Sequence, residues 1–159
     1  MARGPYAEAL SLYRAAGDSY GIAHALQGLG LVAVEQGDAS EGEGRLRECL
    51  ALQREIGDRP GLEATFEGLA GVAALRARTE GRPSAERALR LAGVADAGRE
   101  AHPEWGWRLW EAPLAEPWLA PAFAALGGRG APAAEAARAA GRAMTAEEAI
   151  EYALSGAAE

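Results

Sequence analysis

An internal repeat with a period of 40 residues constrains the fold of this chain more than any other feature of its sequence. A period of this length is typical of stacked helical hairpins, because one hairpin cannot bury its apolar face alone. Stacks of this kind usually bind other molecules. The positions that recur are Leu10, Leu12, Arg14, Gly17, Asp18, Gly21, Gly28 and Val32, which return as Leu50, Leu52, Arg54, Gly57, Asp58, Gly61, Gly68 and Val72.

Glycine, proline and aspartate divide a chain whose composition otherwise favours helix nearly throughout. These breakers predict helices over about 5–16, 20–36, 40–56, 59–78 and 84–100, and then over about 118–126, 132–141 and 146–154. Pro60 should lie in the first turn of the fourth helix. Thr145 and Glu148 have the spacing of a capping box before the last helix. We therefore expect an all-α fold, with repeats over 1–100 and a Trp-rich connection and capping helices over 101–159.

Composition and charge exclude several classes of protein. Hydrophobic residues make up 49% of the chain, which is ordinary for a globular protein. The 16 basic residues, all Arg, and the 23 acidic ones give a net charge of −7, which argues against direct nucleic-acid binding. No apolar run reaches the ~18 residues of a membrane span, and Cys49 has no second cysteine with which to pair. We expect a cytoplasmic protein with no membrane partner.

Small and large apolar residues alternate at set positions within each repeat. In the first repeat they are Leu26, Leu29, Gly30 and Ala33, followed by Leu46 and Cys49; in the second they are Phe66, Leu69, Ala70 and Ala73. This pattern resembles the tetratricopeptide repeat (TPR) family. The chain departs from it where Gly42 replaces the usual alanine and where the closing proline is missing. The resemblance implies an α-solenoid of about two and a half repeats, each an antiparallel pair of helices named A and B.

Two further segments carry a narrower resemblance. Residues 91–95 (Leu-Ala-Gly-Val-Ala) and residues 141–154, which contain the capping box, are similar to the C-terminal end of certain large bacterial regulators. Those proteins combine an NTPase module, sometimes a LuxR-type DNA-binding domain, and a TPR sensor region. The resemblance implies that this chain corresponds to the sensor region alone, since it has no phosphate-binding loop or helix-turn-helix.

The TPR resemblance also implies a binding surface, because the A helices of that family line a concave groove. The family's carboxylate clamp uses Lys, Asn and Arg where this chain has Gln27, Leu31 and Gly68, so acidic chaperone tails are not the expected ligands. The alternative is that these residues only coat a solvated groove. The residues expected to face the groove are His24, Gln27, Leu31, Val34, Glu35, Glu67, Gly71 and Leu75.

Two groups of aromatic and apolar residues are candidates for an association surface. Tyr6, Leu10 and Tyr13 fit a B helix that lacks its A partner, so we expect Leu10, Tyr13 or their neighbours to be exposed. We expect this surface to support self-association; the alternative is that an upstream segment is missing. The second group consists of tryptophans. Because most tryptophans are substantially buried, we expect this group to form a lid over the last repeat. The alternative is a contact surface for a partner. The tryptophans are Trp105, Trp107, Trp110 and Trp118.

No set of residues in the sequence calls for catalysis, a metal or a cofactor. Gly28 and Gly30 lie within a helical pattern, so close helix packing explains them better than a dinucleotide loop does. Cys49 should be buried, on a different face from His24, which argues against a thiol–imidazole pair. We therefore expect a non-enzymatic interaction or effector-sensing module of a bacterial signalling or transcription regulator, which binds a peptide, a protein segment or a small effector. The alternative is a self-assembling scaffold, a homo-oligomer joined through its exposed ends.

Overall fold

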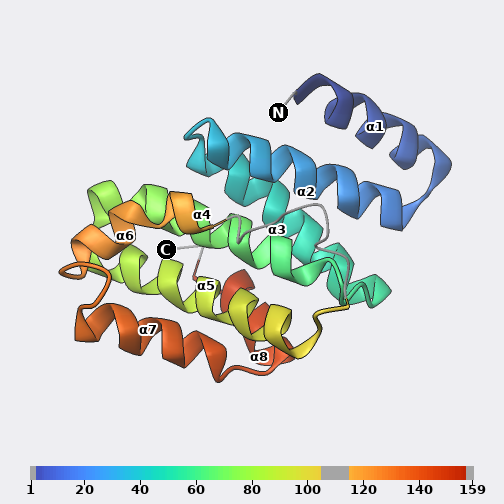
Figure 1. Ribbon diagram of the computed structural model, residues 1–159. Coiled ribbons are helices and arrows are strands. Elements are labelled where there is room, and N and C mark those ends of the chain that lie inside the picture. The colour runs from blue at the N-terminus through green and yellow to red at the C-terminus, as the bar shows by residue number, and fades with distance from the viewer. Residues whose placement is uncertain (1–2, 105–114, 157–159) are drawn as a thin grey trace.

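Helices form all the regular secondary structure in the described part of the chain, which is residues 3–104 and 115–156 of the computed structural model. The predicted all-α class is confirmed, and no strand occurs among those residues (Figure 1). The helices are α1 (Arg3–Ala16), α2 (Ser19–Glu35), α3 (Ala39–Ile56), α4 (Leu62–Glu80), α5 (Arg82–Ala101), the short 3₁₀ helix η2 (Glu116–Trp118), α6 (Ala120–Ala125), α7 (Pro132–Arg142) and α8 (Ala146–Leu154).

Side-chain caps mark the start of three of the described helices, α2, α3 and α8. Asp18 and Asp38 accept hydrogen bonds from backbone N–H groups in the first turns of α2 and α3, and Thr145 and Glu148 form the expected capping box. The prediction for α4 was wrong by one turn. Asp58 accepts a hydrogen bond from the N–H of Gly61 at 3.3 Å, which fixes a tight turn before the helix. Pro60 therefore lies ahead of α4 and not in its first turn.

Each helix from α2 to α5 packs against the helix before it, and α4 also contacts α2. The chain progresses from α1 at one end to α7 at the other (Figure 1). The short α6 packs on α4 and α5, α7 lies along α5, and α8 contacts α3 and α5. The four C-terminal elements thus cover the second hairpin and extend no regular repeat.

The contact between α1 and α2 depends on tyrosine rings that lie over glycines. The ring of Tyr13 fills the space that a side chain at Gly21 would need, and Tyr6 does the same at Gly28. Leu46 occupies the corresponding space at Gly30. The packing interpretation of Gly28 and Gly30 is confirmed, since both glycines allow a bulky side chain to approach the helix backbone.

Cys49 is fully buried in the core between α2 and α3, as expected. Its Sγ–H donates to the carbonyl oxygen of Ala23 at 3.2 Å. Burial raises the pKa of the thiol to about 12, so it remains protonated at neutral pH. His24 is exposed on another face of α2, and the two residues form no pair.

Candidate binding groove and the segment that fills it

The residues predicted to face the groove lie on α2 and α4, which pack against each other. Their exposure differs widely. His24 and Glu35 are exposed to solvent, whereas Gln27 and Leu75 are half-buried. The remaining four are buried: Leu31, Val34, Glu67 and Gly71.

The chain itself covers part of this face. Residues Ala115–Trp118, which we call the return segment, include η2 and lead into α6. The indole of Trp118 lies against α4 at Gly71, where an added Cβ would be 2.8 Å from the Cε3 atom of Trp118 and 2.6 Å from the Cγ1 atom of Val34. Gly71 therefore provides the space in which Trp118 meets α4 beside α2.

Glu67 holds the start of the return segment. Its side chain is only 6% exposed, and its Oε2 accepts a hydrogen bond from the backbone N–H of Ala115 at 3.1 Å. The same carboxylate forms an ion pair with Arg99 of α5. A buried carboxylate is tolerated when it is paired and hydrogen-bonded, and Glu67 meets both conditions.

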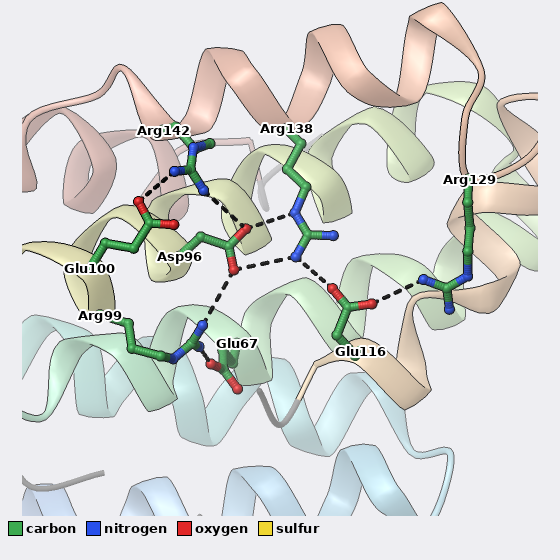
Figure 2. Close-up of polar contacts among 8 residues, drawn as sticks. All are labelled: Glu67, Asp96, Arg99, Glu100, Glu116, Arg129, Arg138 and Arg142. Carbon is green, nitrogen blue, oxygen red and sulfur yellow. Dashed lines mark hydrogen bonds and ion pairs between the residues drawn. The ribbon is translucent and has the colours of Figure 1, made fainter. Parts of the chain in front are cut away.

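Glu116, the second residue of the return segment, is held from the other side. It accepts hydrogen bonds from Arg138 of α7 at 2.5 Å and from Arg129 at 3.0 Å. Arg138 also donates through Nε to Asp96 of α5 at 2.7 Å. Figure 2 shows that these contacts are continuous with those of Glu67.

We call this set the arginine–carboxylate network. Arg99 joins its two halves, because it contacts Asp96 at 3.3 Å as well as Glu67. Arg142 extends the network to Asp96 and to Glu100. Its members come from α4, α5, η2, α7 and the turn before α7, and they carry balanced charge: Glu67, Asp96, Glu100 and Glu116 with Arg99, Arg129, Arg138 and Arg142 (Figure 2).

Two members of the network, Glu116 and Arg138, have pKa values that are shifted in opposite directions. Burial acts to raise the pKa of Glu116, but the hydrogen bonds from Arg138 and Arg129 outweigh it and hold that pKa below its usual range. Burial likewise acts to lower the pKa of Arg138, and its hydrogen bonds to Asp96 and Glu116 outweigh it and raise that pKa. Both groups are therefore charged at neutral pH, and the return segment is held by an intact ion pair.

Sequence reasoning identified only part of this arrangement. Trp118 packs against the core beside α4, while Trp105, Trp107 and Trp110 lie outside the described residues, so the lid interpretation of this group stays a prediction. Glu116 and Arg138 were not singled out. The one signal available was the position of Glu116 two residues before Trp118, and that signal does not indicate where either side chain binds.

The residues proposed for self-association pack against α2 in this structure. Leu10 is buried, and Tyr6 and Tyr13 are half-buried over their glycines. Leu12, at 64% exposure, is the exposed leucine of α1, in place of the expected Leu10. Self-association itself stays a prediction.

The described residues contain no group of three or more His, Cys, Asp or Glu side chains arranged to hold a metal ion. None of the described helices is both long enough and apolar enough to span a membrane. Comparison with protein-family models, with curated proteins and with solved structures finds no match to this chain.

Proposed function

We propose that this chain is a non-enzymatic binding module whose α2/α4 face accepts a short segment of a partner protein, and that the return segment occupies this face in cis. The observation that carries the proposal is the way the return segment is held: an indole lies against Gly71 while a backbone N–H is bound by the buried Glu67. The resemblance to TPR sensor regions supports a place in a bacterial signalling or transcription regulator.

The contacts of the return segment define the chemistry of the proposed partner. Such a segment needs a backbone N–H for Glu67, an acidic side chain for Arg138 and Arg129, and a large aromatic ring two residues after the acidic one. Glu116 and Trp118 meet the last two requirements in cis. We therefore propose an acidic–aromatic peptide as the partner, because a peptide that repeats the contacts of an internal ligand can replace it.

Competition between the two segments sets the threshold for binding. A tethered segment acts at an effective concentration in the millimolar range when its connection is short. A partner must therefore bind with a larger free energy than the return segment, or bind after that segment has been released. This arrangement makes the face available only to a strong or locally concentrated partner, as a sensor requires.

The test is the binding of an acetylated hexapeptide with the sequence of residues 115–120 and a C-terminal fluorescein, followed by fluorescence anisotropy. Trp118→Ala vacates the position beside Gly71, so we expect this variant to bind the peptide at least about tenfold more tightly than the wild-type chain does. A peptide with alanine in place of the tryptophan should lose that gain.

Gly71→Leu in the Trp118→Ala background is the matched control, because its side chain fills the position of the indole. This double variant should no longer bind the peptide, although its circular dichroism spectrum should remain helical. Equal peptide binding by the double variant and by Trp118→Ala would contradict the proposed site. So would an absence of binding by a folded Trp118→Ala variant.

A further inference from the structure

A cavity of about 250 Å³ lies where the start of α4, the end of α5 and the turn between α7 and α8 meet. Its walls are mainly apolar, with Leu62 and Phe66 from α4, Val94 from α5 and Met144 from the turn. Glu63 of α4 brings a carboxylate into the same lining. None of these residues belongs to the return segment or to the arginine–carboxylate network, so this cavity is separate from the proposed groove.

The carboxylate of Glu63 is incompletely satisfied. The residue is 9% exposed, and its Oε2 atom is buried without a hydrogen-bond partner among the described residues. Gly98 of α5 makes room for the group, since an added Cβ there would lie 2.9 Å from Oε1 of Glu63. A buried acceptor without a donor costs free energy, about 1–3 kcal/mol for a neutral group and more for a charged one. A donor entering the cavity would recover this cost.

The charged groups around Glu63 do not offset the cost of burying its carboxylate. Arg99, in the last turn of α5, and His102, the C-cap residue of that helix, favour the ionised carboxylate. Asp58, ahead of α4, disfavours it. Arg59 is a further charged residue of the lining. Burial is the largest effect, and it raises the pKa of Glu63. A cation that binds directly to the carboxylate would therefore lower that pKa again.

We propose that this cavity is a binding site for a compact amphipathic amine, whose ammonium group pairs with the carboxylate of Glu63 and whose apolar body contacts Leu62, Phe66, Val94 and Met144. An anionic ligand would place a like charge beside Glu63, and a wholly apolar ligand would leave Oε2 unpaired. The volume suits one ring with a short arm, because a cavity of about 150 Å³ accommodates benzene.

The probes are benzylamine and its neutral isostere benzyl alcohol, titrated separately into the ¹⁵N-labelled chain at pH 7. Benzylamine should shift backbone amides in three segments, 62–66, 94–98 and 144–146, and should bind at least tenfold more tightly than benzyl alcohol. Glu63→Gln should remove this tenfold preference. Ala97→Leu, which fills the cavity and keeps the carboxylate, should weaken the binding of both compounds.

A pH series supplies a second readout. Only the ionised carboxylate attracts the ammonium, so benzylamine should bind more tightly as the pH rises through the raised pKa of Glu63. Benzyl alcohol should show no such increase.

Three results would overturn the proposal: equal affinity for the two compounds, unchanged benzylamine binding by Glu63→Gln, or no shift in the three segments at saturating benzylamine. Because the cavity is separate from the groove, Trp118→Ala should leave the benzylamine affinity unchanged. Failure of the hexapeptide test would not explain a negative result here.

Discussion

At the scale of single residues, glycines within helices have two different roles. A side chain at Gly141 of α7 would overlap the carbonyl oxygen of Arg90 in α5, and one at Gly93 of α5 would overlap that of Arg138 in α7. The two helices therefore meet at their backbones. Gly44 of α3 is the opposite case, because an added Cβ there would meet nothing within 4 Å. Glycine is required at the first two positions and only lowers helix propensity at the third.

Gly141→Ala and Gly44→Ala form a matched pair that tests this distinction. We expect Gly141→Ala to lower the free energy of unfolding by about 1–3 kcal/mol, because the methyl group forces α7 away from α5. Gly44→Ala should raise it by about 0.5–1 kcal/mol, the gain in helix propensity. Guanidinium chloride unfolding followed by circular dichroism measures both, and stabilisation by Gly141→Ala would show that the helices do not cross at this glycine.

At the scale of elements, the sequence predicted the bounds of the helices better than it predicted which helices and segments contact one another. Local signals placed α1, α2, α3, α5, α7 and α8 to within about two residues, because caps and breakers act over one turn. The position of the return segment depends on contacts between residues far apart in the sequence: Ala115 meets Glu67, 48 positions away, and Glu116 meets Arg138, 22 positions away. Charged residues on helix faces give no sequence signal of which partner they meet, so these contacts and the cavity beside Glu63 were not predicted.

The attachment of α8 illustrates such an unpredicted contact between elements. Arg87 of α5 donates hydrogen bonds to the carbonyl oxygens of Tyr152, Ala153 and Ser155, and Arg47 of α3 donates to those of Ala153 and Leu154. The last carbonyls of a helix have no partner within it, and cations near them are stabilising. These two arginines therefore bind the C-terminal end of α8 to α3 and α5.

Arg87→Met tests this attachment, because it keeps much of the apolar stem and removes the donors. We expect a loss of about 1.5–3 kcal/mol in the free energy of unfolding, as for hydrogen bonds from a charged group. Amide hydrogen exchange should be accelerated mainly within α8. Arg78→Met, at an exposed position on α4, controls for the lost charge and should leave exchange in α8 unchanged. Uniform acceleration across all helices would contradict a local role.

At the scale of the whole molecule, the arginine–carboxylate network joins parts of the chain that the repeat does not relate. It connects α4 and α5 of the second hairpin with η2 and α7. Because Glu116 belongs to the return segment, the charge state of this network also determines how firmly the proposed groove is filled. Protonation of Glu116 should weaken its bonds to Arg138 and Arg129 and so favour release of the segment.

The pH dependence of stability therefore tests the network as a unit. The pKa of Glu116 is lower in the folded chain than its ordinary value of about 4.3, so its contribution to stability is present above that value and is lost as the pH falls through the folded pKa. Its side chain is 33% exposed, and solvent screening limits the contribution to about 1 kcal/mol. We expect Glu116→Gln to reduce the difference in unfolding free energy between pH 7 and pH 3 by that amount, measured by urea unfolding. Glu135→Gln, at an exposed position on α7, should leave the difference unchanged. An equal effect of both variants would mean that net charge, and not the ion pairs of Glu116, controls the acid sensitivity of the fold.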